Sequence, residues 1–257
     1  ARLYGDAKGV SRRMRIVIFS GTTEGRELSR KLAALGAEVT VCVATELGAE
    51  EQGVAEGVAV HTGRLDAAGM TALLQDSVLC VDATHPYATE ATCNIRAAAA
   101  AAGVEYRRLL RPAGVLPAGC VVLQSAAQAA QYLAEKHGNV LLATGAKELP
   151  AFSALAPMRL YPRVLPTLAG IAACEAAGIP HRNIIAMQGP FTVAMNTALM
   201  QQYNIRYMVT KDGGAAGGFS EKVLAAAQCG VQLVVLRRPA EQGETADIIL
   251  QRCRELL

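Results

Sequence analysis

Short apolar runs alternate with segments of helical periodicity along most of the chain. The first run, Ile16–Phe19, is continuous, as expected of a strand buried on both faces of a parallel sheet. After a small polar turn, Leu28, Leu32 and Leu35 recur at helical spacing. The alternation continues to a fifth strand at Tyr106–Leu110, which predicts a doubly wound parallel sheet. Between these segments we predict strands at Glu38–Ala44, Val58–His61 and Val78–Val81, and a long helix at Thr89–Ala102.

The same rhythm restarts after Ala113–Gly119, a stretch rich in Gly, Pro and Ala that is typical of a linker. Residues 14–115 and 116–257 are therefore expected to form two α/β domains that face one another across a cleft. Residues 1–13 are polar and without periodicity, and we expect them to be a disordered or vector-derived leader. In the second half we predict strands or extended segments at Cys120–Leu123, Val140–Ala143, Arg159–Val164, Ile184–Met187, Tyr207–Val209 and Val231–Leu236, and a last helix at Glu244–Leu256.

Composition indicates a globular protein and narrows its function classes. Apolar residues make up 52% of the chain and charged residues 18%, which excludes an intrinsically disordered protein. The net charge is only +3 and no basic block persists, so nucleic acid is not an expected partner. No apolar run approaches the length of a membrane span and no signal segment is visible. We therefore expect a cytoplasmic protein with no membrane partner.

Cysteine and histidine spacing argues against metal chemistry. The seven cysteines are scattered singly without a CxxC pair, so neither a disulfide framework nor a zinc site is expected. Cys42 and Cys80 lie inside apolar runs and are interpreted as small core residues. The four histidines show no HxH or HxxxH spacing, and we predict no metal site.

Polar clusters come directly after predicted strands in both halves of the chain. Ligands of open α/β sheets bind at the carboxyl ends of the strands, so this placement predicts a site lined with functional groups. The clusters are GTTEGR (Gly21–Arg26), TGRLD (Thr62–Asp66), DATHPYA (Asp82–Ala88), TGAKEL (Thr144–Leu149), QGPF (Gln188–Phe191) and TKDGG (Thr210–Gly214).

The first cluster, Gly21–Arg26, joins a buried strand to a helix. Thr22 or Thr23 can cap that helix, because a hydroxyl there accepts the unpaired amides of the first turn. Free amides and the positive end of the helix dipole make such a turn an anion site. The cluster matches neither GxGxxG nor GxxxxGK[ST], so an ordinary strand-to-helix connection remains the alternative.

The cluster Asp82–Ala88 carries the residue types of acid–base chemistry. His85 and Tyr87 are candidate proton donors at neutral pH, and Asp82 is placed to orient the histidine. The alternative is structural: Asp82 and Thr84 would cap the next helix, and His85 would make only a local hydrogen bond.

Two features of the second half are suited to anions. The glycine-rich turn Thr210–Gly218 opens a helix, so its amides can cradle a phosphate or carboxylate, with Lys211 adding charge. Arg163 lies between two prolines and can clamp a carboxylate with its guanidinium. A flexible surface turn and a peripheral salt bridge are the alternatives. We expect three further arginines to do no more than solvate the end of the fifth strand: Arg107, Arg108 and Arg111.

In the order and spacing of its motifs, the sequence resembles the precorrin-6A reductase family of cobalamin (vitamin B12) biosynthesis. The resemblance runs from Met14 to about Leu256 and rests on GTTEGR (Gly21–Arg26), TGRLD (Thr62–Asp66), DATHPYA (Asp82–Ala88), YPRVLP (Tyr161–Pro166), QGPF (Gln188–Phe191) and TKDGGAAGGFSEK (Thr210–Lys222). It implies two Rossmann-like domains with the active site between them. It also implies hydride transfer from NADPH or NADH to a carbon–carbon double bond of a polycarboxylate tetrapyrrole. The motifs look more like those of the cobalt-dependent branch, so the cobalt form of precorrin-6A is favoured.

With this resemblance, the strand-end clusters receive roles. The catalytic candidates are His85, Tyr87 and Lys211. The cofactor candidates are Gly21, Thr22, Thr23, Glu24, Gly25, Arg26, Thr45, Arg64 and Thr84. The substrate-binding candidates are Thr144, Lys147, Arg163, Gln188, Gly213, Gly214, Ser220 and Lys222.

Two other function classes remain open at this stage. A nucleotide-dependent transferase would use the Gly21–Arg26 turn for phosphates, although the chain lacks a Walker lysine and a Mg²⁺-binding carboxylate pair. A two-lobed α/β ligand-binding protein is the second alternative. Neighbouring enzymes of the pathway are considered as partners. The oligomeric state is not predicted by the sequence.

Overall fold

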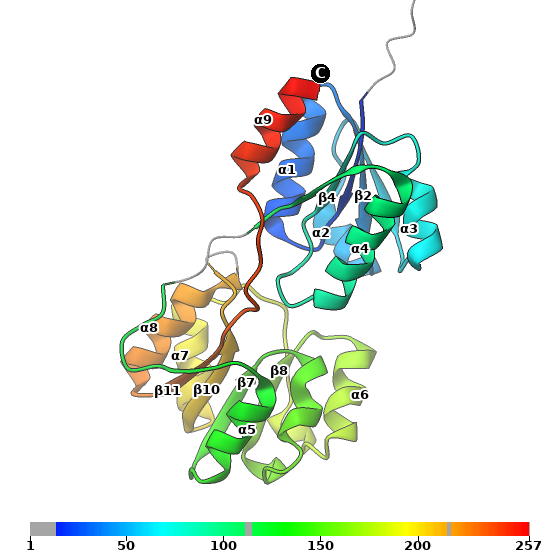
Figure 1. The fold of residues 1–257 in the computed structure, drawn as a ribbon. Helices are drawn as coiled ribbons and strands as arrows, with labels where there is room; N and C mark the ends of the chain where they lie inside the picture. Colours follow the sequence, from blue (N-terminus) through cyan, green and yellow to red (C-terminus); the bar gives the residue numbers. More distant parts are fainter. Residues whose placement is uncertain (1–13, 111–114, 215–216, 257) are drawn as a thin grey trace, which may run out of the picture. The chain divides into compact units, whose positions relative to one another are not determined.

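The computed structural model describes residues 14–110, 115–214 and 217–256. The chain divides into two compact units, each built around its own parallel sheet (Figure 1). Of the described residues, unit 1 holds 14–110 and 240–256, and unit 2 holds 115–214 and 217–239. The expectation of two α/β units is therefore confirmed, while the predicted leader, residues 1–13, lies outside the described residues.

Unit 1 has five parallel strands in the order β3-β2-β1-β4-β5. The order reverses at β1, which is the switch point where doubly wound sheets bind ligands. The strands are β1 (Arg15–Phe19), β2 (Glu38–Val43), β3 (Val58–Thr62), β4 (Leu79–Asp82) and β5 (Glu105–Arg108). The helices are α1 (Thr23–Ala34), α2 (Glu46–Gln52), α3 (Ala67–Leu74), α4 (Thr89–Ala102) and α9 (Ala246–Leu256).

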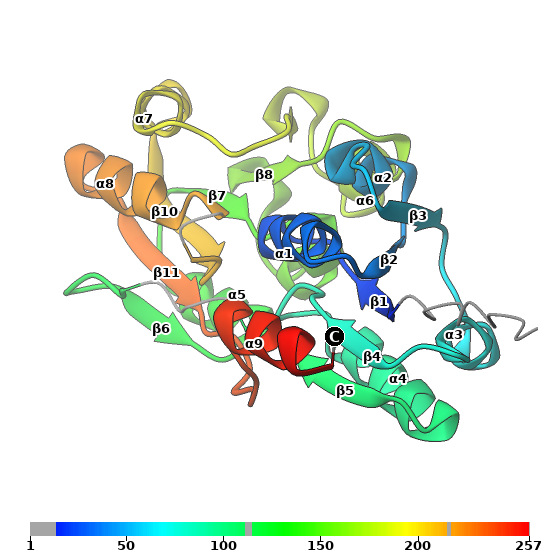
Figure 2. The same ribbon diagram turned by 90° about the horizontal axis from the view of Figure 1, so that it is seen from above.

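The continuous apolar run of β1 is explained by cores on both of its faces. Ile16 and Ile18 pack in one cluster with α1 and α9, whereas Val17 and Phe19 pack in the other with α3 and α4. In Figure 2 α1 and α9 lie on one side of this sheet, and α3 and α4 lie on the other. Alternate residues of a strand point to opposite faces, so burial of both faces requires an unbroken apolar sequence.

Unit 2 has six parallel strands in the order β6-β11-β10-β7-β8-β9. Helices α5 and α6 share one core cluster with the segment after β7, and α7 and α8 share the other. The strands are β6 (Val121–Leu123), β7 (Asn139–Ala143), β8 (Leu160–Val164), β9 (Ile185–Ala186), β10 (Ile205–Lys211) and β11 (Gln232–Leu236). The helices are α5 (Ala126–Ala134), α6 (Leu168–Ala176), α7 (Val193–Gln202) and α8 (Phe219–Cys229), with 3₁₀ segments η1 (Ala146–Phe152), η2 (Pro157–Arg159) and η3 (His181–Asn183).

The last helix departs from the predicted domain boundary. Residues 116–257 were expected to form one domain, but α9 packs beside α1 in unit 1 (Figure 1). Its buried residues Ile249, Leu250 and Cys253 belong to the same core cluster as β1. The returning chain also joins unit 1 through its backbone, since the Glu244 amide donates to the Arg108 carbonyl at 2.8 Å. The amphipathic pattern of α9 predicts a helix but does not specify which sheet it covers.

Several predicted elements change at their ends. The strand expected at Tyr106–Leu110 is Glu105–Arg108, and the one expected at Ile184–Met187 shortens to two residues, Ile185–Ala186. Helix α2 and segment η1 were not predicted: α2 follows β2 after a turn of only two residues, and η1 begins inside the cluster Thr144–Leu149. Within the described residues no helix is long and apolar enough to cross a membrane.

Candidate functional site

The site in unit 1 begins at Thr22, which links α1 to the end of β4. The Thr22 hydroxyl accepts a hydrogen bond from the Gly25 amide at 3.1 Å and donates one to the Ala83 carbonyl at 2.9 Å. Thr22 is the N-cap of α1, so of the two predicted capping residues it is the one that caps. The first turn of α1 is thereby held against the switch point of the sheet.

Gly25 permits this close approach. A Cβ atom at Gly25 would lie 2.5 Å from Ser20 Oγ and 2.8 Å from Ala83 Cβ, so a larger residue does not fit. A small pocket opens at this junction and is lined by Thr22, Glu24, Thr84, Pro86 and Leu109. Helix amides, a hydroxyl and a hollow at the strand ends are suited to a phosphate group.

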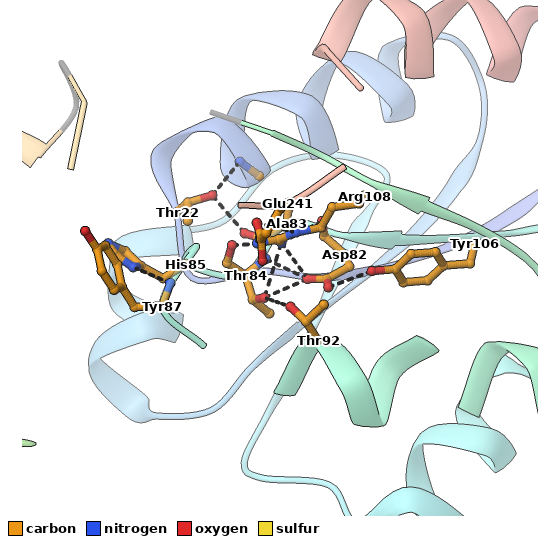
Figure 3. A network of polar contacts seen from close by, with 11 residues as sticks. Thr22, Asp82, Ala83, Thr84, His85, Tyr87, Thr92, Tyr106, Arg108 and Glu241 are labelled. Carbon is orange, nitrogen blue, oxygen red and sulfur yellow. Dashed lines mark hydrogen bonds and ion pairs between the residues drawn. The ribbon is translucent and has the colours of Figure 1, made fainter. Parts of the chain in front are cut away.

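Behind this pocket, Asp82 is the centre of a buried polar network (Figure 3). Its side chain is fully buried at the end of β4. Oδ1 accepts from the Thr84 amide at 3.0 Å, from the Thr84 hydroxyl at 2.7 Å and from Arg108 Nη1 at 2.9 Å. Oδ2 accepts from the Tyr106 hydroxyl at 3.0 Å. Burial, followed by the charge of Asp82, raises the pKa of Tyr106, so the phenol stays protonated as a donor.

Arg108 completes the network. The prediction that it does no more than solvate a strand end is therefore wrong. It is 4% exposed, and its Nη1 also donates to the Thr84 carbonyl at 2.9 Å. Its Nη2 lies 3.0 Å from Glu241 Oε2, on the segment that returns to unit 1. Arg108 ends β5 in register with Asp82 at the end of β4, a pairing that only the sheet order reveals. Arg111 lies outside the described residues, and Arg107 pairs with Glu105 and Glu244.

His85 and Tyr87 lie together, away from the Asp82 carboxylate (Figure 3). Their ring centroids are 5.4 Å apart, and the Tyr87 amide donates to His85 Nδ1 at 3.4 Å. Asp82 therefore does not orient the histidine as expected. Of the structural alternative, the local hydrogen bond of His85 is present, but capping by Asp82 or Thr84 is wrong, because the N-cap of α4 is Ala88 and no side chain caps this helix.

The other cofactor candidates lie along the same edge of the sheet. Thr45 follows β2 and caps α2, where its hydroxyl accepts from the Gly48 amide at 3.1 Å. Arg64 is exposed just after β3. Arg26 donates from Nη1 to the Glu51 carbonyl at 2.8 Å and so joins α1 to α2. Thr23, Glu24 and Gly25 form the first turn of α1, and Gly21 precedes its N-cap.

Among the candidates of unit 2, Arg163 is a buried cation and Lys222 is a half-buried one. Arg163, at the end of β8, donates from Nη1 to Asn196 Oδ1 at 2.8 Å and lies 4.0 Å from the centre of the Phe191 ring. Lys222 Nζ donates to the Gly217 carbonyl at 3.1 Å. Burial lowers the pKa of Arg163 to about 10, and burial together with the charge of Arg163 lowers the pKa of Lys222 to about 8.

The remaining candidates of unit 2 are more dispersed. Lys211 Nζ lies 2.8 Å from Glu148 Oε1, so its charge is paired. The Thr144 hydroxyl is buried at the end of β7 without a hydrogen-bond partner, whereas Lys147 is exposed. Ser220 donates to Glu221 Oε2 at 3.0 Å. Gln188 is exposed after β9, and Gly213 and Gly214 follow β10.

Comparison with known proteins gives consistent matches over most of the chain. The family described as precorrin-6x reductase CbiJ/CobK matches residues 15–254. The cobalt-precorrin-6A reductase of Priestia megaterium is 37% identical over 231 residues, which are 87% of this chain and 90% of that protein. The cobalt-precorrin-6A reductase of Methanothermobacter thermautotrophicus is 35% identical over 250 residues, 90% of this chain and 82% of that one.

A solved structure shares both the fold and part of the sequence. The protein described as CobK precorrin-6A reductase aligns with a TM-score of 0.76 and 27% identity, covering 94% of this chain and 97% of its own. The predicted Rossmann-like class with parallel sheets is therefore confirmed.

Proposed function

The chain belongs to the precorrin-6x reductase family, and from this premise we propose that it reduces a macrocycle double bond of cobalt-precorrin-6A to give cobalt-precorrin-6B in cobalamin biosynthesis. Reductases named for the cobalt form share 37% and 35% identity with the chain, whereas a precorrin-6A reductase of Rhodobacter capsulatus shares 29%. This difference supports the cobalt-containing substrate over the metal-free one.

The observation that carries the proposal is the anion site at the start of α1. Reductases of this family use a nicotinamide cofactor, which supplies the hydride when bound. The Thr22 cap, the close approach of α1 to β4 that Gly25 permits, and the pocket with Thr84 fit a pyrophosphate at the switch point. The whole first turn, Gly21–Arg26, is proposed to hold the cofactor.

We propose NADPH rather than NADH on the basis of Arg64. This exposed guanidinium follows β3, on the same edge of the sheet as Thr45 after β2, where a ribose phosphate is accommodated in related folds. Arg64→Ala is expected to lower kcat/KM for NADPH and leave kcat/KM for NADH unchanged. Equal loss with both cofactors would contradict the assignment.

The residues proposed for the chemistry are His85, Tyr87 and Lys211. Reduction of a carbon–carbon double bond needs a proton at the neighbouring carbon, and a histidine–phenol pair after β4 can donate one. Lys211, paired with Glu148, is proposed to assist by electrostatic stabilisation. Macrocycle carboxylates are proposed to bind to unit 2 through Thr144, Lys147, Arg163, Gln188, Gly213, Gly214, Ser220 and Lys222.

The decisive experiment mixes the protein with NADPH and cobalt-precorrin-6A and follows nicotinamide absorbance. We expect oxidation of NADPH that depends on the macrocycle. Neither compound should be lost when the two are mixed without the protein. The His85→Ala/Tyr87→Phe double variant should bind both compounds but turn over at least about 100-fold more slowly. Binding of the macrocycle without NADPH oxidation would favour the two-lobed binding protein, and consumption of a nucleoside triphosphate would favour the transferase.

A further inference from the structure

Glu241 is largely enclosed, although the segment that carries it is exposed. The chain that returns to unit 1 passes from Ala240 to Thr245 without helix or strand, apart from the bridge residue Glu244, and residues 240, 242, 243 and 245 are exposed. The Glu241 side chain, by contrast, is only 14% exposed, because it reaches inward to the Arg108 guanidinium. This contact joins the returning segment, residues 240–245, to the buried network around Asp82.

The returning segment lies directly against β5. The Glu244 amide donates to the Arg108 carbonyl at 2.8 Å, and the Leu110 amide donates to the Glu244 carbonyl at 2.9 Å. Gly243 permits this approach, since a Cβ atom there would lie 2.6 Å from the Arg108 carbonyl oxygen and 2.6 Å from Leu110 Cγ. The backbone of the segment is therefore held beside β5, and the Glu241 side chain extends from a fixed position.

The two edges of the Arg108 guanidinium have different partners (Figure 3). Nη1 donates to the Asp82 carboxylate at 2.9 Å and to the Thr84 carbonyl at 2.9 Å. Nε and Nη2, on the other edge, donate to Glu241 Oε2 at 3.3 Å and 3.0 Å. Bonds to Nη1 alone fix the position of that atom but not the plane of the group, whereas the guanidinium is a rigid planar fork. Glu241 therefore fixes the orientation in which Arg108 meets Thr84.

Thr84 and Leu109 connect this arrangement to the pocket in unit 1, because both residues line it. The Thr84 carbonyl and hydroxyl accept from Arg108 Nη1 at 2.9 Å and 3.3 Å. Leu109 forms the bridge with Glu244, and its amide donates to the Asp82 carbonyl at 2.9 Å. Two of the residues that line the pocket are thus held by contacts that lead back to the returning segment.

We propose that Glu241 is a positioning residue for the cofactor pocket: through Arg108 it holds the backbone at Thr84 in the conformation that receives the cofactor. The assignment of a cofactor to this pocket rests on the proposed function. A carboxylate that acted directly on the cofactor phosphates would repel them, so its removal would strengthen binding. A positioning carboxylate has the opposite effect, because its removal lets the Arg108 guanidinium turn away from Thr84.

The affinity for NADPH distinguishes Glu241 from its neighbour Glu244. In Glu241→Ala we expect the Kd for NADPH, measured by nicotinamide fluorescence, to rise about 10-fold, within the range by which members of one hydrogen-bonded network couple. Glu241→Gln keeps an oxygen acceptor at the same reach and should restore most of the affinity.

Glu244→Ala is the matched control. It breaks an ion pair of the same segment, with Arg107, whose side chain points to the opposite face of the sheet from that of Arg108. Its Kd for NADPH should stay at the wild-type value. An equal rise in Glu241→Ala and Glu244→Ala, or a lower Kd in Glu241→Ala than in the wild type, would overturn the proposal.

Hydrogen exchange gives a second readout that needs no cofactor. The Thr84 amide donates to Asp82 Oδ1 at 3.0 Å, so peptides that span residues 83–88 should exchange faster in Glu241→Ala than in the wild type or Glu244→Ala. Unchanged exchange in Glu241→Ala would overturn the positioning role even if the wild type oxidises NADPH. If exchange becomes faster but the wild type binds no NADPH, the proposed function fails and the link from Glu241 to Thr84 stands.

Discussion

Arg108 and Asp82 form an ion pair in which both side chains are almost completely buried. Arg108 Nη1 lies 2.9 Å from Asp82 Oδ1, with 3% and 0% of the respective side chains exposed. The same Nη1 group donates to the carbonyls of Asp82 and Thr84. Through these bonds Arg108 fixes the backbone that leads from β4 to His85, so stability and the geometry of the candidate site depend on one residue.

Arg108→Met is therefore expected to destabilise the protein by about 3–5 kcal/mol, because it leaves the Asp82 carboxylate buried without a counter-ion. Urea unfolding followed by circular dichroism measures the loss. The Asp82→Asn/Arg108→Met double variant removes both charges and should recover part of the stability. If the double variant is as unstable as the sum of the two single variants, the pair is not coupled.

The Thr22 cap gives a prediction with a matched control. Thr22→Ala removes the bond from the Gly25 amide and should cost about 1 kcal/mol of stability. Thr167 caps α6 with the same 3.1 Å bond, from the Gly170 amide, so Thr167→Ala should cost about the same. Only Thr22→Ala should also raise the Kd for NADPH, measured by nicotinamide fluorescence. Equal Kd values for the two variants would place the cofactor elsewhere.

The architecture was predictable because the hydrophobic pattern reports burial directly. The unbroken apolar sequence of β1 predicts a strand covered on both faces, and the Thr22 cap and the Gly103 helix end follow from local chemistry. The placement of α9 was not predictable in the same way. The sequence pattern of an amphipathic helix predicts that one face is buried, but it does not indicate which sheet covers that face.

The sequence predicted which strand ends carry the candidate site, but not which of its residues contact one another. Strand-end clusters identified Thr22 and Thr84, which line one pocket in the structure. Asp82 was assigned to His85 because the two are close in sequence, yet its partners are Tyr106 and Arg108 on the neighbouring strand. Contacts between strands depend on sheet order, and the sequence alone does not fix that order.

Gly25 offers a test of the close approach between α1 and β4. Gly25→Ala should destabilise the protein by about 1–3 kcal/mol and weaken NADPH binding, since its Cβ would lie 2.8 Å from Ala83 Cβ. Gly69 occupies the equivalent position in α3, where the nearest atom to a Cβ would be Asp66 Oδ1 at 3.2 Å. Gly69→Ala should therefore be milder and leave the Kd for NADPH unchanged. If Gly25→Ala and Gly69→Ala bind NADPH with similar Kd values, the close packing at Gly25 does not affect cofactor binding.

The lowered pKa of Glu105 predicts how acid affects the stability of unit 1. Hydrogen bonds from Arg252 of α9, and then from Arg107, lower the pKa of Glu105 from 4.5 to about 2. A lowered carboxyl pKa contributes stability that is complete above pH 4.5 and is lost as the pH falls towards 2. Glu105→Gln should thus be less stable than the wild type at pH 7, and the difference should shrink between pH 4.5 and 2. Glu38→Gln, at an exposed glutamate of β2, is the control and should show no such convergence.

The lowered pKa of Lys222 is a penalty on wild-type stability, whereas the lowered pKa of Glu105 is a favourable contribution. Burial first, and Arg163 second, lower the pKa of Lys222 from 10.5 to about 8, so between these values the unfolded chain binds a proton that the folded protein does not. Wild-type stability therefore contains a penalty that is complete below pH 8 and is relieved as the pH rises to 10.5.

Lys222→Met has no such penalty, so its stability relative to the wild type should be highest near pH 7 and decline between pH 8 and 10.5. Thermal unfolding of both proteins across this range measures the difference. Lys136→Met, which removes a lysine that lies over the Tyr132 ring in unit 2, corrects for a general effect of losing a lysine. A difference that stays constant with pH would mean that the folded protein does not desolvate the Lys222 amine. A decline would mean that the folded protein holds the Lys222 amine in surroundings that disfavour its charge.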